Sequence, residues 1–367
     1  MVSSKKPPSS FVVGLALFSM FFGSGNLIFP LMLGAQYQGY FYICAIGFVI
    51  TAVALPTLGI MAMIPAQGHY DQLFDKLLEP KYSRWFFLLI LLFWIPLGSG
   101  PRCVILAHAS ISTYVIGTPV MWLFSAIFLA LVYFFVNNRK RLIELLGKIL
   151  TPALLLSILC IVISSLVAKG DLDASDIPAL EVFTKSLMDG YYTQDLIAAV
   201  FFSASLVSML NQNMNEKLAL KKTWRGGLVA VALLALFYGA LMAASAIHAE
   251  YLSGLSGEKL VSTLAHIALG SYFGGISSIA VSLACLTTEI ALVLVFADFL
   301  ATHFSHIPFK IALLFTLGLV WLMSLLHFEG LMAVIAPAMQ IIYPILFLLV
   351  IRLLWIKRYK SHTGELK

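Results

Sequence analysis

The sequence predicts an all-α integral membrane protein, and three observations support this fold class. Of the 367 residues, 61% are hydrophobic and only 11% are charged, whereas soluble domains carry about 25% charged residues. The apolar residues gather in ten stretches, each long enough for the roughly 20 residues that a spanning helix needs. Glycine and polar residues interrupt two of these stretches, which predicts that two of the ten helices are discontinuous.

The ten predicted spans follow one another along a single transmembrane domain. We expect them at residues 11–33, 40–64, 85–115, 118–136, 143–168, 187–210, 225–248, 270–301, 308–326 and 330–355, before a tail at 356–367. The third and eighth exceed the length that a span needs, which allows tilt or extension beyond the bilayer.

Basic residues are sorted by loop, and their sorting predicts the orientation of the chain. With a cytoplasmic N-terminus, 19 of the 23 lysines and arginines lie inside, three lie outside (Lys169, Lys185 and Lys259) and Arg102 lies in a span. Because positive loops stay cytoplasmic, both termini are predicted to lie on the cytoplasmic side of a cell (inner) membrane. The net charge of +6 therefore indicates orientation in a lipid bilayer and gives no support for nucleic-acid binding.

The longest polar stretch divides the spans into five and five. It covers about 169–186 and is expected outside the membrane. A half with an odd number of spans inserts with the opposite orientation to its partner, so repeat one (about 11–168) and repeat two (about 187–355) can form an inverted-topology repeat. Such repeats place a site at mid-membrane, where the first helix of each half is broken.

The first span contains the interruption Phe22-Gly23-Ser24-Gly25-Asn26. Lipid offers no hydrogen-bond partners, so a break here is expected to leave backbone groups for a ligand or an ion. The start of the resumed helix suits a carboxylate, and carbonyls at the end of the preceding helix suit a cation. The alternative is that the glycines only allow close helix packing.

The sixth span opens with the matching interruption Asp189-Gly190-Tyr191-Tyr192-Thr193-Gln194-Asp195. At about 1.5 Å per residue, Asp195 is expected roughly 10–15 Å below the outer surface. In the eighth span, Thr287 and Thr288 offer paired hydroxyls to a monovalent cation. Alternatively, each hydroxyl bonds back to a carbonyl one turn earlier.

Four charged residues fall within spans, namely Arg102, Asp195, Glu289 and Asp298. An ionisable group at mid-bilayer costs several kcal/mol unless it is paired or hydrated, so each is a candidate functional residue. Asp298 is expected near the interface, and Arg102 with Asp195 is a candidate gating or structural ion pair. Glu289 is open to three interpretations: a silent protonated group, a cation partner or a carrier of the coupling proton.

Other side chains give no support for an enzyme. The eight histidines are scattered, and we find no metal-ligand cluster, nucleophile elbow or phosphate loop. The four cysteines lie in apolar stretches without metal-ligand spacing. We therefore expect no catalytic residues and no cofactor.

Several segments together resemble the branched-chain amino acid:cation symporter family, which belongs to the leucine-transporter fold. The matching segments are FFGSGNLIFP at 21–30, ITAVALP at 50–56, PR at 101–102, GKILTP at 147–152, GYYTQD at 190–195 and ACLTT at 284–288. The resemblance covers essentially the whole chain in the expected order. It implies a five-plus-five helical fold and alternating access around a site built from the first, third, sixth and eighth helices.

The resemblance also implies roles for particular residues. A sodium ion would take carbonyls near Ser19 and Phe22, the Ala284 carbonyl, and the hydroxyls of Thr287 and Thr288. The amino-acid substrate would place its carboxylate at the amides around Ser24 and Gly25. Further substrate or second-cation contacts would come from Asn26 and Thr193, with Asp195 and Glu289 as additional candidates.

Two departures from the family stand out. The chain has ten predicted spans where about twelve are usual, and Glu289 stands where a small residue is usual. We expect sodium-coupled import of leucine, isoleucine or valine, with methionine as a further candidate. The rivals are the same fold with proton coupling through Glu289 or with other amino-acid selectivity, and a channel or non-transporting receptor. The oligomeric state is left open.

Overall fold

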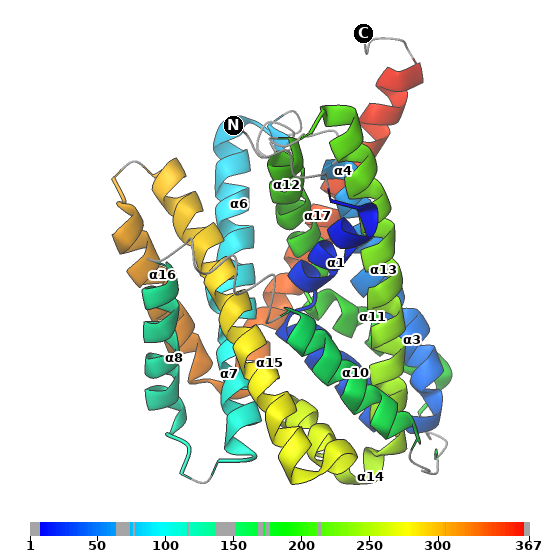
Figure 1. Ribbon diagram of the computed structural model, residues 1–367. Helices are drawn as coiled ribbons and strands as arrows, with labels where there is room; N and C mark the ends of the chain where they lie inside the picture. Colours follow the sequence, from blue (N-terminus) through cyan, green and yellow to red (C-terminus); the bar gives the residue numbers. More distant parts are fainter. Residues whose placement is uncertain are drawn as a thin grey trace.

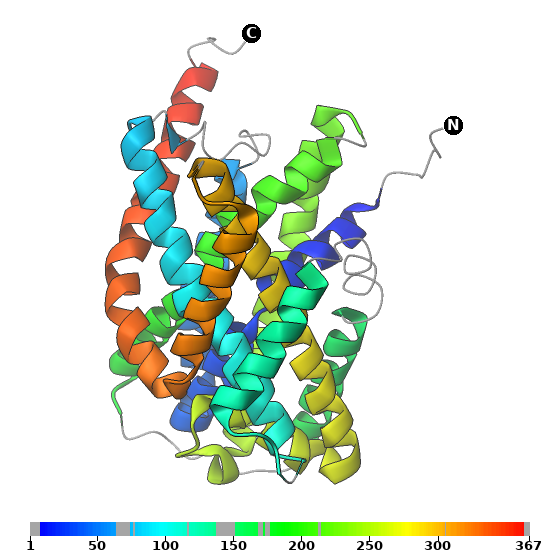
Figure 2. The same ribbon diagram turned by 90° about the vertical axis from the view of Figure 1, so that its left-hand side faces the viewer.

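The computed structural model describes residues 8–63, 74–75, 78–115, 117–136, 151–167, 172, 177–211, 214–304 and 306–362. Within these residues the chain forms a bundle of helices without β-strands (Figure 1). This confirms the predicted all-α class. Seen from two sides, α1 begins in the upper half of the bundle, where α17 also ends (Figure 2).

The helices of the first half match the first five predicted spans. They are α1 (Ser10–Phe21), α2 (Ser24–Tyr37), α3 (Phe41–Val49), α4 (Leu55–Met63), α6 (Pro80–Trp94), α7 (Gly100–Ser112), α8 (Met121–Val136) and α10 (Thr151–Val167). One π-helical turn, η2 (Ile50–Ala54), joins α3 to α4, and another, η4 (Ile95–Ser99), joins α6 to α7. The hydrophobic pattern gave no signal for either turn, although π-turns are frequent at functional sites.

The second half has a corresponding series. It consists of α11 (Ala179–Tyr192), α12 (Asp195–Asn211), α13 (Glu216–Ile247), α14 (Ala249–Leu252), α15 (Leu260–His303), α16 (Phe309–Ser324) and α17 (His327–His362). Over both halves, the described residues include five helical stretches long and apolar enough to cross a membrane, together with three shorter apolar helices. The number of ten spans stays a prediction.

Two boundaries deserve comparison with the predictions. The sixth span was expected from residue 187, but α11 already begins at Ala179. Its charged residues Glu181 and Lys185 are exposed while Val182 is buried, so the polar stretch belongs in part to an amphipathic helix. The eighth span was expected from residue 270, and α15 is kinked at Gly270, where φ is 72°. Residues 143–150 and most of 169–176 lie outside the described part of the chain.

The long helix α13 carries both halves of the broken first helix. A β-carbon at Gly14 of α1 would lie 2.7 Å from Val229 Cβ, and one at Gly226 would lie 2.7 Å from Val13 Cγ1. At Gly34 of α2, an added β-carbon would collide with the backbone of α13. Only glycine allows approaches this close, so α1 and α2 are both seated firmly on α13.

Candidate functional site at the two helix breaks

The first helix is interrupted between α1 and α2, where the sequence predicted it. α1 ends at Phe21, and α2 begins at Ser24 after Gly23 in an extended conformation (φ −104°, ψ −168°). No side chain caps the start of α2. The first amides of a helix have no partner inside it, so those of Ser24 and Gly25 are left available at this break.

The sixth helix is interrupted between α11 and α12, again as predicted. α11 ends at Tyr192, and Gln194 has the left-handed φ of 67°. Such a conformation is uncommon outside glycine and clusters at functional sites. Here a side chain caps the new helix, because Thr193 Oγ1 accepts from the Asp195 amide at 3.4 Å. The same hydroxyl donates to the Gly190 carbonyl at 2.9 Å.

The two breaks meet inside the bundle. A β-carbon at Gly25 would lie only 3.3 Å from Thr193 Cα. Asn26 Nδ2 donates to Asp195 Oδ2 at 2.8 Å, and the Tyr238 hydroxyl of α13 donates to the same oxygen at 2.9 Å. Asn26 also contacts the Tyr238 hydroxyl directly. All three side chains are buried, so a hydrogen-bonded triad joins both breaks to α13.

A small cavity of about 20 Å³ opens between the breaks, which is room for about one water molecule. Its polar wall comes from both breaks and from α7 and α15, and its apolar wall comes from aromatic and aliphatic side chains. The lining residues are Phe21, Gly23, Ser24, Gly25, Asn26, Trp94, Ser99, Cys103, Thr193, Asp195, Ala198, Phe202, Thr288 and Leu292. In this closed conformation the walls must separate before the cavity can hold a larger molecule.

Arg102 lies beside this cavity but is not in the predicted ion pair. Its guanidinium donates to the Tyr192 carbonyl and to Gln194 Oε1, and Nη2 donates to Ser99 Oγ at 2.9 Å. No ion pair joins it to Asp195, whose Oδ2 is held by the triad. The pairing prediction overlooked the carbonyl at the end of α11, which the break leaves without a helical partner.

The predicted residues of α15 separate into two groups. Thr288 lines the cavity, as does Phe21, the last residue of α1. Thr287 Oγ1 donates to the Ala284 carbonyl at 2.8 Å, which is the back-bonded arrangement that the sequence left open. Ser19 lies within α1 and Phe22 follows its last turn. Among the described side chains, those of Phe22, Ala284 and Thr287 do not line the cavity.

Glu289 lies behind the cavity wall and not in it. Its side chain is fully buried, and within the described part of the chain neither carboxyl oxygen has a hydrogen-bond partner. A β-carbon at Gly100 would lie 3.0 Å from each of these oxygens, so the carboxyl packs against the start of α7. The structure thus brings Ser24, Gly25, Asn26, Thr193 and Asp195 together around the cavity and leaves Glu289 one layer outside.

Helix α17 holds the second break from the other side, which the sequence did not predict. The Leu196 amide donates to the Tyr343 hydroxyl at 2.8 Å, and Gln340 Nε2 donates to the Tyr192 hydroxyl at 3.0 Å. Tyr238 and Tyr343 were both missed because a tyrosine within an apolar span resembles an ordinary core residue. The available signal was that a buried Tyr hydroxyl usually needs a partner.

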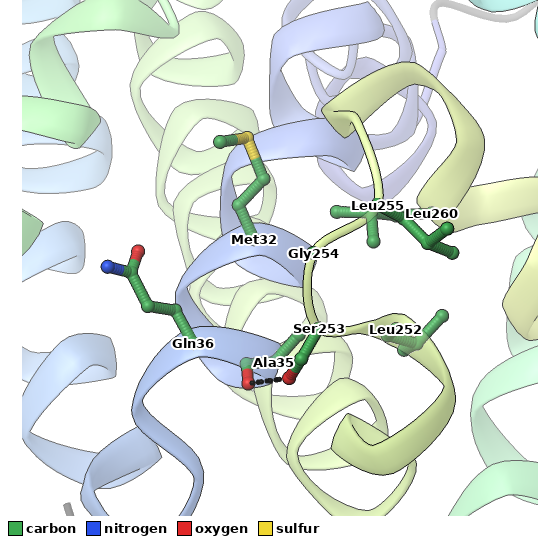
Figure 3. Close-up of a pocket in the computed structure, with 8 residues that line it drawn as sticks. All are labelled: Met32, Ala35, Gln36, Leu252, Ser253, Gly254, Leu255 and Leu260. Carbon is green, nitrogen blue, oxygen red and sulfur yellow. Dashed lines mark hydrogen bonds between the residues drawn. The ribbon is translucent and has the colours of Figure 1, made fainter.

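Two of the larger cavities outside the breaks border α2. One of about 390 Å³ is lined by residues of α2, α11 and α17, including Phe29 and Tyr192. The other, of about 360 Å³, lies between α2 and the 252–260 segment (Figure 3), where Ser253 Oγ donates to the Ala35 carbonyl at 3.1 Å. The Phe29 ring contacts those of Tyr192 and Phe328 at 6.1 and 6.0 Å between centroids. All three rings line the 390 Å³ cavity.

The arrangement of helices matches that of a solved transporter. The crystal structure of MhsT in complex with L-phenylalanine superimposes with a TM-score of 0.61, covering 94% of this chain and 89% of MhsT at 17% identity. The fold is therefore the leucine-transporter fold, with its discontinuous first and sixth helices.

Sequence comparisons define the family. The model of the branched-chain amino acid transport protein family matches residues 6–365. The chain belongs to this family, whose members are transporters and not enzymes. A protein of Staphylococcus saprophyticus, provisionally named as a branched-chain amino acid carrier, is 31% identical over 92% of this chain and 79% of its own length. A similarly named protein of Staphylococcus aureus strain USA300 is 30% identical over 94% of this chain and 82% of its own.

Proposed function

We propose that this protein imports branched-chain amino acids by sodium symport with alternating access. Leucine, isoleucine and valine are the expected substrates, with methionine as a further candidate. The observation that carries the proposal is the closed cavity where two broken helices meet. It joins an uncapped helix start, a buried carboxylate and an apolar wall.

Each part of a zwitterionic amino acid has a counterpart at this cavity. The amides of Ser24 and Gly25, at the positive end of α2, suit the carboxylate. Asp195 suits the ammonium group, with Asn26 and Thr193 fixing its position through their hydrogen bonds. An aliphatic side chain fits the apolar wall, which consists of Phe21, Trp94, Ala198, Phe202 and Leu292.

Sodium is the coupling ion in this proposal. Its ligands would be the carbonyls of Ser19, Phe22 and Ala284 with the hydroxyls of Thr287 and Thr288. Support comes from Thr288, which lines the cavity together with Phe21 at the end of α1. The hydroxyl of Thr287 keeps a lone pair for a cation while its proton bonds to Ala284. By the sorting of basic residues, the protein sits in the inner membrane with both termini in the cytoplasm.

The central experiment is uptake of labelled leucine into proteoliposomes under an imposed sodium gradient. We expect saturable uptake that competes with isoleucine and valine and supports counterflow. A proton gradient alone should not drive it. Uptake driven by protons without sodium would favour the rival coupling through Glu289, and non-saturable flux would favour a channel.

Thr288→Ala tests the sodium site directly. Removing one of the five proposed oxygen ligands should raise the half-saturating sodium concentration about tenfold, since a lost interaction of about 1.4 kcal/mol changes affinity by that factor. Thr57→Ala is the matched control, because its hydroxyl bonds to the Val53 carbonyl at 2.8 Å on α4, away from the cavity. Equal sodium dependence in both variants would contradict the assignment.

A further inference from the structure

Arg102 is a buried cation whose direct partners are all neutral. Its side chain is 1% exposed. The guanidinium bonds to a backbone carbonyl, an amide oxygen and a hydroxyl, and no carboxylate of the described residues lies within ion-pair distance. A buried charge is costly unless an opposite charge compensates it. The Phe29 ring, 5.9 Å from Arg102 Cζ, offers only a cation–π contact.

The guanidinium also keeps unused donors. It carries five N–H groups in a fixed plane, and the structure uses three of them, toward Tyr192, Gln194 and Ser99. Nε–H is buried and has no hydrogen-bond partner among the described residues. Buried donors are usually satisfied, so an unpaired arginine Nε–H indicates that an acceptor is missing here.

The position of the Arg102 guanidinium, beside the cavity, indicates where the missing acceptor would lie. A β-carbon at Gly25 would lie 3.0 Å from Arg102 Nη1, so the guanidinium lies against the uncapped start of α2. Gly25 and Ser99 both lie next to the guanidinium, and both line the cavity. Thr193 lines it as well, and its neighbours in sequence, Tyr192 and Gln194, accept hydrogen bonds from Arg102. A fixed positive charge and the positive end of a helix therefore meet at one side of the cavity.

We propose that Arg102 binds the carboxylate of the transported amino acid, together with the amides at the start of α2. This inference rests on the proposed function and adds a specific recognition group to it. The negative side of the cavity is Asp195, held by Asn26 and Tyr238. The site thus separates a positive from a negative group, which selects a substrate that carries both a carboxylate and an ammonium group.

The rival role for Arg102 is purely structural. By bonding to Tyr192 and Gln194, it also fixes the second break. A structural role would affect every ligand of the cavity alike. A carboxylate-binding role would affect leucine but spare leucinamide, which keeps the ammonium group and the side chain but has no carboxylate.

The experiment measures binding of labelled leucine to the purified protein in lipid nanodiscs. Unlabelled leucine and leucinamide are added as competitors, at concentrations up to saturation. In Arg102→Gln we expect leucine affinity to fall about 30-fold, the size of a lost charge-assisted hydrogen bond, with leucinamide changing less than about threefold. Unlabelled leucinamide can be followed by calorimetry where label binding becomes weak. Arg84→Gln, an exposed arginine of α6, is the matched control and should leave both affinities unchanged.

Arg102→Lys covers the case in which the glutamine variant does not fold. Lysine keeps the charge but presents it as a compact ammonium without the planar fork, so leucine should weaken several-fold while leucinamide stays constant. Parallel losses for the two ligands, or an unchanged leucine affinity, in whichever variant folds would overturn the inference. Failure of the wild-type protein to bind any branched-chain amino acid would instead overturn the proposed function, so the two failures are distinguishable.

Discussion

The two helix breaks meet at one cavity but are held in contrasting ways. The first, before α2, depends on Gly23 and Gly25 and has no capping side chain. The second, before α12, is capped by Thr193 and is bonded by Arg102 from α7 and by Tyr343 from α17. One break therefore offers unused backbone donors, while the other has most of its polar groups satisfied.

This difference separates two tasks that a transporter site must combine. A ligand is bound most strongly by groups that have no other partner, and the first break supplies them. A binding geometry must also be held by a rigid surround, and the second break supplies that. Substitutions at the first break should therefore change ligand affinity, and substitutions of the side chains that hold the second break from neighbouring helices should change stability.

The largest effect is expected at the point where the breaks join. Asp195→Asn removes the negative charge from the group that accepts hydrogen bonds from Asn26 and Tyr238. Losing one partner of a buried charged network costs about 2–5 kcal/mol, so leucine uptake in proteoliposomes should fall about 100-fold. Glu181→Gln, an exposed acid on α11, is the control. Retention of a tenth or more of wild-type uptake would show that the triad is dispensable.

A smaller effect is expected at the first break. In Gly25→Ala the new methyl group would lie 3.0 Å from Arg102 Nη1 and 3.3 Å from Thr193 Cα. Overpacking of this kind costs about 1–3 kcal/mol, so leucine affinity should fall roughly tenfold, as measured by equilibrium binding. Gly239→Ala on α13 meets nothing within 4 Å and should bind normally. Equal affinities in the two variants would mean that space at the first break does not matter.

The smallest effect on binding is expected at the second break. Tyr343→Phe removes the acceptor of the Leu196 amide and leaves a buried N–H unpaired, at a cost of about 1–3 kcal/mol. We expect a lower melting temperature in a thermal-shift assay and leucine affinity within about threefold of wild type. A variant with unchanged melting temperature and strongly weakened binding would reverse the contrast between the breaks.

The sequence was informative where polar residues contradicted an apolar setting. Gly23 to Asn26 and Thr193 to Asp195 predicted both breaks, because lipid gives such residues no partners. The same argument identified Arg102 as a candidate functional residue, but it predicted the carboxylate of Asp195 as its partner. Sequence reasoning pairs opposite charges and does not anticipate a carbonyl that a break leaves free, such as that of Tyr192.

The residues that were missed share a different cause. Tyr238 and Tyr343 come from helices far away in sequence, and their hydroxyls reach the site only through packing. Likewise, the charges of Glu181 and Lys185 suggested a loop, because the apolar residues between them are too few for a spanning pattern. Tertiary context decides such positions, and a single sequence contains little of it.

The glycine contacts between α1 and α13 have a mechanical consequence. Gly14 and Gly226 let α1 and α13 pack so closely that a β-carbon at either position would collide with a valine of the other helix. Opening of the cavity at the Ser10 end therefore requires α1 to separate from α13, with the bend in the chain at Phe22 and Gly23, between α1 and α2. The close packing at Gly14 and Gly226 then contributes to the energy needed to separate α1 from α13.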